Sequence, residues 1–300
     1  MNWEYLREEE FKDAIERTGG LCVLPIGCLE KHGQQGPVGT DSLKAIKVAE
    51  EAAELEEVMV FPTGMWLGDM SGANTVDNPA EKRKAGNISM KSETLLTVLE
   101  ELCDEIARNG FRKILFLNSH GGNIPMLQLF LRRQGEKNRN YATMWTPLRS
   151  KITSSPIDFY NHMLEHRSEY PMLKDADMEV LKSWAEKGTW GGGHADFTET
   201  AMVMGYFPEL IALDRLEAES GISTHQSDYL AEAGVNCVGQ WGANFPNAIN
   251  GFPAHGVTQS IGQAMNTFCA RELAKIFKML KNDEKCVAIA TKKLHQYKEV

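Results

Sequence analysis

The chain has 300 residues, of which 42% are hydrophobic and 24% are charged, and its formal net charge is -9. This composition is that of an ordinary globular protein. The acidic balance argues against nucleic-acid or anionic-membrane binding, because both need a basic surface, and no apolar stretch approaches the roughly 20 residues of a membrane span. The N-terminus lacks an apolar signal core, and the six cysteines form no CxxC pair. We therefore expect reduced thiols in a cytoplasmic protein.

Apolar runs alternate with amphipathic segments along the first half of the chain. The runs that predict strands are Leu21–Ile26, Val58–Pro62 and Ile114–Leu117. The segments that predict helices are Ser42–Leu55, Ser92–Asn109, with Ser92 as its cap, and Ile124–Arg133. This alternation favours an α/β fold with a mostly parallel sheet and helices on both faces.

The second half is less regular. Residues 147–190 mix turn residues with short helical pieces, which we interpret as a lid or an insertion beside the main sheet. A long helix is predicted from Thr258 to Leu280, and the charged tail after Lys281 is expected to fray. No internal repeat or low-complexity linker divides the chain, so we expect a single domain over residues 1–300.

Three glycine-punctuated loops carry imidazole or carboxylate groups. The first follows the strand that ends at Ile26 and contains Glu30, His32 and Asp41. The second, Asn118-Ser119-His120-Gly121-Gly122-Asn123, follows the third strand, and the last contains His194 and Glu199 after three glycines. Ligands of open parallel sheets bind beyond the carboxyl ends of the strands, and glycines let a backbone approach a ligand closely. The three loops together predict a metal site.

Taken singly, each loop has an ordinary structural interpretation. A histidine at a strand end is more often a hydrogen-bonded surface residue than a ligand. The segment around His120 could be a turn in which Asn123 caps the next helix, and the segment after His194 could be an ordinary helix start. Each of these interpretations competes well with a metal site for a single loop, but they compete poorly when the three loops are taken together.

Four segments also resemble the creatininase (creatinine amidohydrolase) family. They are "LPIGCLEKHGQQGPVGTD", "NSHGGN", "GHADFTET" and "NGFPAHGVTQSIGQAM", and the similarity runs from about residue 20 to 280. The resemblance implies a three-layer α/β/α sandwich, a two-metal hydrolase that acts on a small molecule, and assembly as a homo-oligomer, usually a hexamer.

By position, the resemblance also implies roles for individual residues. Glu30 and His120 correspond to ligands of one metal, His32 to a ligand of the other, and Asp41 to the bridging carboxylate. His194 corresponds to the catalytic histidine, and Trp190 to a tryptophan that covers the substrate.

The sequence departs from creatininase in the loop after the third strand. Creatininase has a glutamate in this loop that completes its second metal site, and this sequence has Gly122 at that position. We therefore expect Glu199 to be the fifth ligand, with Asp196 as its rival. Gly121 replaces an aromatic residue, which reshapes the substrate pocket at Gly121 and Gly122, and residues 70–90 also depart from the family's substrate loop.

Two imidazoles and three carboxylates suit two divalent Zn, Mn or Fe ions per chain. A bridging hydroxide between the ions would attack an amide carbon of a small cyclic substrate, and His194 would protonate the leaving atom. Two alternatives stay open. One is a ring-opening carbon–carbon hydrolase that acts on a cyclic diketone from sugar or inositol breakdown, and the other is a metal-binding scaffold without catalysis.

Overall fold

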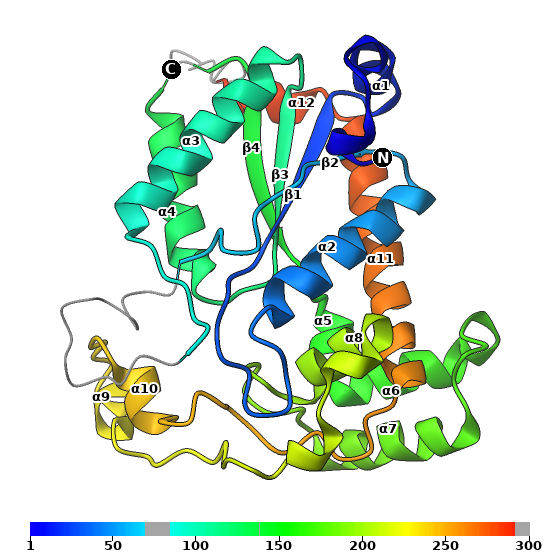
Figure 1. Cartoon of the computed structure of the whole chain (residues 1–300), viewed down its shortest axis with the longest axis vertical. Helices are drawn as coiled ribbons and strands as arrows, with labels where there is room; N and C mark the ends of the chain where they lie inside the picture. The colour runs from blue at the N-terminus through cyan, green and yellow to red at the C-terminus, as the bar shows by residue number, and fades with distance from the viewer. Residues whose placement is uncertain (70–84, 138, 292–300) are drawn as a thin grey trace, which may run out of the picture.

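The computed structural model of the chain describes residues 1–69, 85–137 and 139–291. Within these ranges, four strands form one parallel sheet in the order β2-β1-β3-β4 (Figure 1). The strands are β1 (Leu21–Ile26), β2 (Met59–Val60), β3 (Lys113–Asn118) and β4 (Ala142–Pro147). The predicted parallel sheet is therefore confirmed, while β4 was not predicted from the sequence.

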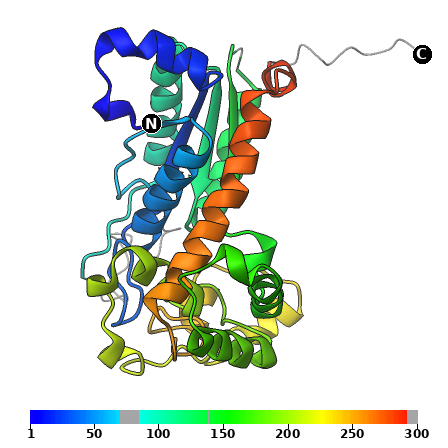
Figure 2. The same ribbon diagram turned by 90° about the vertical axis from the view of Figure 1, so that its right-hand side faces the viewer.

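Helices cover both faces of this sheet (Figures 1 and 2). One core contains α2 (Thr40–Leu55), α8 (Phe197–Tyr206) and α11 (Gln259–Lys281). The other contains α1 (Phe11–Arg17), α3 (Ser92–Arg108) and α4 (Asn123–Gly135). Alternate residues of β1 face opposite sides, since Val23 lies in the first core and Leu24 in the second. The expected three-layer α/β/α sandwich is confirmed.

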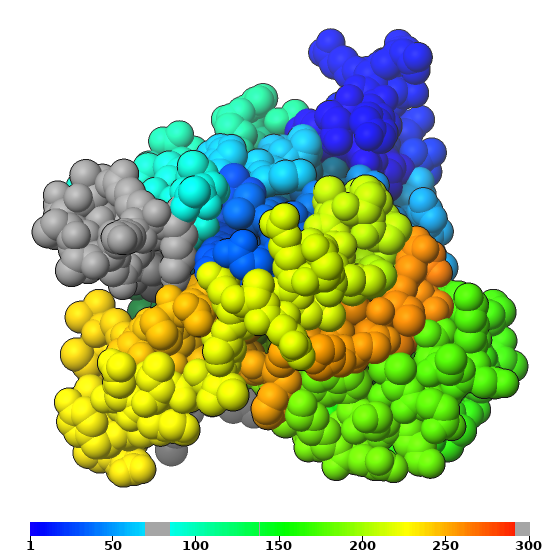
Figure 3. Space-filling view, turned by 60° about the horizontal axis from the view of Figure 1, so that its bottom comes forward, coloured from blue at the N-terminus to red at the C-terminus, as the bar shows by residue number. Residues whose placement is uncertain are grey.

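The segment interpreted as a lid or insertion is mostly helical. It contains α5 (Lys151–Ser154), α6 (Pro156–Glu165) and α7 (Asp175–Lys187). Phe159 of α6 and Leu181 of α7 are buried in the same core as α11. Figure 3 shows the molecule with the lower end of Figure 1 turned toward the viewer. The green surface of this segment lies on one side, and the yellow surface around α9 (Asp228–Glu232) and α10 (Gln240–Asn244) lies on the other. The single-domain interpretation and the lid stay predictions.

One local expectation is wrong. Lys91, not Ser92, is the N-cap of α3, because the Ser92 hydroxyl instead donates to Asp69 Oδ2 at 2.7 Å. In the tail after Lys281, α12 (Lys285–Ala290) is helical, and residues 292–300, on which the expected fraying also falls, lie outside the described residues. The short 3-10 helices are η1 (Trp3–Tyr5), η2 (Glu8–Glu10), η3 (Arg167–Glu169), η4 (Pro208–Leu210) and η5 (Leu213–Arg215). None of the described helices is both long and apolar enough to cross a membrane.

Candidate metal centre

Two adjacent strand ends place the first two loops side by side. Ile26 at the end of β1 pairs with Asn118 at the end of β3. The Asn118 side chain donates to the backbone oxygen of His120 at 2.9 Å, which fixes the start of the second loop. The sequence thus positions Glu30 and His120 through the register of two buried strands.

Asn123 joins three loops beneath the site. Its amide donates to the backbone oxygen of Gly27 at 3.1 Å and to Asn118 Oδ1 at 3.0 Å, and its Oδ1 accepts from the Asp69 N–H at 2.7 Å. Asn123 is the first residue of α4, and the N-cap position is Gly122. The interpretation of Asn123 as an ordinary helix cap is therefore wrong, because its side chain is occupied by these contacts.

A first group of donors surrounds His120. Its Nδ1 lies 2.9 Å from Glu30 Oε1 and 3.2 Å from Asp41 Oδ2. Donor atoms of these three residues and of Cys28 all lie within 4.8 Å of one another. This is a compact set of imidazole, carboxylate and thiol groups with the spacing that a metal ion requires.

A second group surrounds His32 and shares one residue with the first. His32 Nε2 lies 3.2 Å from Glu199 Oε2 and 3.6 Å from Asp41 Oδ1. The two oxygens of Asp41 therefore face different histidines, as a bridging carboxylate would. Asp41 lies in the first turn of α2, where the helix dipole favours a negative charge.

Of the two rivals for the fifth ligand, the structure brings Glu199 and not Asp196 to this group. Asp196 is the N-cap of α8, and its Oδ1 accepts from the Thr198 hydroxyl at 2.7 Å and from the Glu199 N–H at 3.1 Å. Its other oxygen lies 3.7 Å from Arg149. Glu199 Oε2 is positioned in turn by the Ala195 N–H at 2.8 Å.

All three histidines use one ring nitrogen on a backbone carbonyl. His32 Nδ1 lies 3.0 Å from the Glu30 oxygen, His120 Nε2 lies 3.0 Å from the Asp69 oxygen, and His194 Nε2 lies 2.9 Å from the Lys31 oxygen. A carbonyl only accepts, so these nitrogens carry hydrogen. The other ring nitrogen of each histidine faces carboxylate oxygens, which is the orientation of a metal-ligating imidazole.

The donor atoms approach one another without forming complete hydrogen bonds. Among the described residues, Glu30 Oε1 and His32 Nε2 are buried and have no hydrogen-bond partner, although each lies within ion-pair distance of an opposite group. Buried polar atoms are rarely left in this state. Atoms that converge on a common point and are not aligned with one another fit ligands of a bound cation.

Charges within the cluster shift the pKa values of its members in the direction opposite to that of burial. Burial alone would lower the pKa of His32, but the carboxylates of Asp41 and Glu199 raise it well above its usual value. Burial would likewise raise the pKa of Asp41, but Lys44 and His32 hold it well below its usual range. The pKa of Glu199 is also lowered, against burial, by Lys44 and His32. Carboxylates that stay ionised are the hard ligands that a divalent cation prefers.

Sequence reasoning missed two members of the cluster. The buried Lys44 ammonium lies 2.9 Å from Asp41 Oδ1 and contacts Glu199 Oε1. The Cys28 thiol donates to Asp41 Oδ2 at 3.4 Å. The spacing of Lys44, one helical turn after Asp41, was a usable signal for this pair. Nothing in the sequence indicated the contact with Glu199, which lies 155 positions away.

His194 lies at the edge of the cluster. Its Nδ1 is 3.5 Å from Glu30 Oε1, and its ring centroid is 4.5 Å from that of His32. The next residue, Ala195, has a φ of 53°, in the left-handed region that non-glycine residues seldom adopt. This strained turn aims the imidazole at Glu30 while the Ala195 N–H bonds Glu199.

Trp190 is buried in the core. It is 2% exposed, its ring stacks on Phe197 at 4.9 Å, and its indole N–H donates to the Thr153 oxygen at 3.1 Å. These contacts hold it in the core, and its role in covering the substrate stays a prediction. Trp241 is instead 44% exposed and packs edge-on against His194 at 5.2 Å.

The two glycines after His120 have different surroundings. A Cβ on Gly122 would lie 2.4 Å from His120 Nε2 and 2.5 Å from the Asp69 oxygen, so no side chain fits there. A Cβ on Gly121 would meet no atom within 4 Å, so space is open at that position. Residues 70–84 of the expected substrate loop lie outside the described residues.

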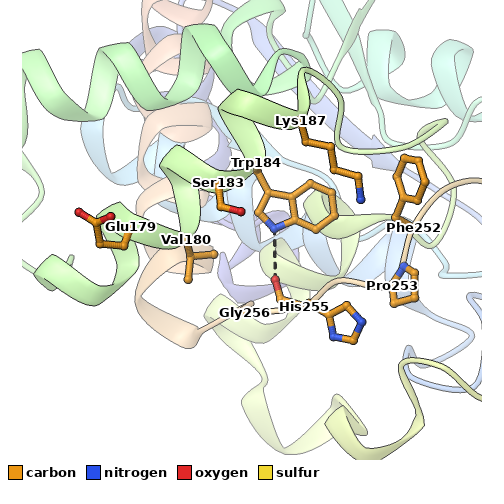
Figure 4. A pocket seen from close by; sticks show the side chains of 9 residues that line it. All are labelled: Glu179, Val180, Ser183, Trp184, Lys187, Phe252, Pro253, His255 and Gly256. Carbon is orange, nitrogen blue, oxygen red and sulfur yellow. Dashed lines mark hydrogen bonds between the residues drawn. The ribbon is translucent and has the colours of Figure 1, made fainter.

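A separate cavity of about 520 Å³ lies between α7 and residues 252–256 (Figure 4). The Lys187 ammonium lies 3.4 Å from the centroid of the Phe252 ring, and the Trp184 N–H donates to the His255 oxygen at 3.1 Å. The residues that line this cavity include none of the donors described above. The cavity is therefore distinct from the metal cluster.

The fold and the donor set together define an α/β protein with a candidate divalent-metal site of histidines and carboxylates. The chain belongs to the creatininase family: the sequence model of that family, described as creatinine amidohydrolase, matches residues 4–277. The resemblance noted in its motifs is therefore confirmed at the level of the family.

Relatives of known name are diverse. The chain is 24% identical to creatinine amidohydrolase from Pseudomonas putida over 214 residues, which cover 69% of this chain and 72% of that protein. It is 23% identical to 3-dehydro-scyllo-inosose hydrolase from Thermotoga maritima, over 73% of this chain and 59% of that protein. A 33% identity to the mycofactocin precursor peptide peptidase of Mycobacterium tuberculosis covers 38% of this chain and 45% of that protein.

Solved structures of creatininase share the fold. One crystal structure of creatinine amidohydrolase superposes with a TM-score of 0.67 at 18% identity, covering 94% of this chain and 98% of that chain. A manganese form of creatininase gives a TM-score of 0.63 at 17% identity, covering 94% and 99% of the two chains.

Proposed function

We propose that the chain is a metal-dependent hydrolase that cleaves an amide C–N bond in a small, cyclic substrate. The observation that carries the proposal is the common orientation of His32, His120 and His194. Each imidazole gives one nitrogen to a backbone carbonyl and turns the other toward carboxylates of one buried cluster. Family membership supplies the amide bond as the first candidate for cleavage.

The residues of the cluster take separate roles in this proposal. Glu30, Asp41 and His120 would hold a divalent ion, with His32 and Glu199 on the other side of Asp41. The ion, when bound, would polarise a carbonyl and lower the pKa of water. His194 would give a proton to the leaving nitrogen from Nδ1, since its Nε2 is committed to the Lys31 oxygen. Trp241 would hold the ring of His194 in place.

The open space at Gly121 bears on the substrate. A Cβ at this residue would have no protein atom within 4 Å, so a substrate could occupy the space beside His120. We infer that Gly121 and Gly122 form part of the substrate wall, as the sequence predicts. The proposal places the substrate against backbone at this point, which favours a compact ring over a long side chain.

Carbon–carbon hydrolysis is the second candidate, and one comparison favours it. The relative named 3-dehydro-scyllo-inosose hydrolase aligns with 73% of the chain. The same cluster would serve that reaction, because the enolate that leaves a cyclic 1,3-diketone is stabilised by its second carbonyl. A non-catalytic metal scaffold stays the third candidate, and it gives His194 no task.

An assay of the purified chain separates these candidates. Creatinine, lactams, formamides and short peptides would be tested beside cyclic 1,3-diketones, before and after chelation and after return of Zn²⁺ or Mn²⁺. We expect turnover of an amide that chelation abolishes and metal restores. Metal-dependent opening of diketones alone would select the second candidate. Turnover that persists in the chelated protein would overturn metal dependence.

The remaining predictions from the sequence concern assembly, location and metal number. We propose a homo-oligomer, with a hexamer expected, which light scattering on the purified chain tests directly. A cytoplasmic location agrees with the six cysteines, all of which are free thiols in the structure. The donors form three overlapping groups, two of which share Asp41 and the third of which is Glu30, His32 and His194. The charge of Lys44 bears on what occupies the group of His32, Asp41 and Glu199.

A further inference from the structure

Lys44 is a buried cation inside the cluster. It lies on α2 one turn after Asp41, and its side chain is 2% exposed. Its ammonium lies 2.9 Å from Asp41 Oδ1 and contacts Glu199 Oε1. A buried ammonium is stable only when it is paired with opposite charges, and these two carboxylates provide the pairing.

The same two carboxylates are donors of the second metal position. That position consists of His32, Asp41 and Glu199, so Lys44 contacts two of its three members. Asp41 Oδ1, the oxygen that faces His32, is also the one that Lys44 contacts. An ion at the second position would share this oxygen with the ammonium, and the two cations would repel each other across a site with little water to screen them.

The first position has no such competitor among the described residues. Glu30 Oε1 and Asp41 Oδ2 face His120, and the Lys44 contacts go to other oxygens. Lys31, the neighbour of Glu30, pairs instead with Glu219 at 2.6 Å. The first position therefore keeps its donors available for a divalent ion.

The charges of the cluster also distinguish one bound ion from two. Glu30, Asp41 and Glu199 carry three negative charges, and Lys44 supplies one positive charge. A second divalent cation would add two further positive charges to a buried cluster in which Lys44 and His32 already face the carboxylates of Asp41 and Glu199. We propose that the Lys44 ammonium takes the place of the second metal ion, so that the chain holds a single divalent ion at Glu30, Asp41 and His120.

This inference rests on the proposed metal-dependent function and revises the two-ion expectation. Under this inference, Glu199 is a counter-ion of Lys44 in the native chain. The inference also assigns Lys44 a positioning role, because the ammonium fixes the oxygen of Asp41 that a second ion would otherwise bind. A nearly isosteric, uncharged side chain at residue 44 should therefore open the second position.

Metal stoichiometry tests the inference without any need for a substrate. The full chain would be stripped with chelator, reloaded with excess Zn²⁺, desalted and measured by elemental analysis and native mass spectrometry, with Mn²⁺ as a second probe. We expect one ion per chain for the wild type and two for Lys44→Met. Adding Glu199→Gln to Lys44→Met should return the count to one, because the second position then loses a ligand.

Lys47→Met is the matched control, since Lys47 lies on the same helix, is 42% exposed and pairs with Glu50. It should keep the wild-type count. Two ions on the wild-type chain would overturn the inference even if the Lys44 variants do not fold, and so would a single ion on folded Lys44→Met. A wild-type chain that binds no ion would instead overturn the proposed function itself.

Discussion

Gly122 lies so close to His120 that a Cβ on this glycine would be 2.4 Å from the imidazole Nε2. Any side chain at residue 122 must therefore break the contact between His120 and the Asp69 oxygen, which sets the orientation of the imidazole. We expect Gly122→Ala to lower metal affinity by about 10–100-fold, the usual effect of losing such a partner. Metal titration by calorimetry measures this change.

Gly121→Ala is the matched control for that variant. The added methyl would meet no atom within 4 Å, so metal affinity should stay at the wild-type value. Equal losses in both variants would mean that the loop tolerates no change of any kind. Unchanged affinity in Gly122→Ala would show that His120 does not depend on this orientation.

His194→Ala separates proton transfer from metal binding. His194 lies at the edge of the cluster, and its Nδ1 is 3.5 Å from Glu30. We expect the variant to keep its metal content and its fold while turnover falls by about 10²–10⁴-fold, the usual contribution of a positioned proton donor. Elemental analysis, a thermal melt and turnover on one preparation check this. Wild-type turnover per folded molecule would remove His194 from the mechanism.

Trp190 and Trp241 should respond differently to truncation. Trp190→Ala removes a core side chain and should reduce the free energy of unfolding by about 3–5 kcal/mol. Trp241→Ala should leave stability nearly unchanged, because the side chain is 44% exposed, and reduce turnover through His194. Urea unfolding and turnover distinguish the pair. A loss of activity in Trp190→Ala without loss of stability would support the role that the sequence predicts.

Asp177 should make the chain sensitive to acid. Burial would raise its pKa, but hydroxyls of Ser260 and Thr258, each at 2.7 Å, help to hold the pKa below its usual value. A depressed folded pKa stabilises the fold above the unfolded value of about 3.9, and this contribution is lost as pH falls through the folded pKa. These contacts join α7 to the start of α11.

Asp177→Asn should therefore reduce the free energy of unfolding by on the order of 1 kcal/mol near neutral pH. The difference from the wild type should shrink as pH falls below about 4, the unfolded pKa, toward the lower folded pKa of Asp177. Urea unfolding at several pH values measures both quantities. A difference that does not change with pH would assign the effect to packing and not to charge.

The elements that the sequence predicted well are buried on both faces. The run Leu21–Ile26 became β1 without any change of bounds, because all six of its residues are buried. The missed strand β4 lies at the sheet edge and is only partly buried, so its sequence, ATMWTP, carries no apolar run. Apolar patterning reports burial, and it fails where a strand is half exposed.

The residues of the candidate site that lie in local sequence motifs could be predicted. Glu30, His32, Asp41, His120 and Glu199 meet in one cluster because the strand ends that carry the first loops are adjacent. Lys44 escaped prediction because a lysine on an amphipathic helix usually lies in solvent, and only the tertiary fold brings Glu199 to it. The burial of Trp190 was not predicted, because its spacing from His194 does not determine which way its side chain turns.

The metal content of Asp41→Asn tests the central claim most directly. Asp41 faces both histidine groups, so replacing it removes a charged ligand while keeping the size of the side chain. Asp196→Asn, at a carboxylate held by Thr198 and Arg149, is the control. For folded protein reloaded with excess Zn²⁺, we predict that Asp41→Asn is nearly metal-free and that Asp196→Asn matches the wild type. Full wild-type metal content in Asp41→Asn would contradict the account.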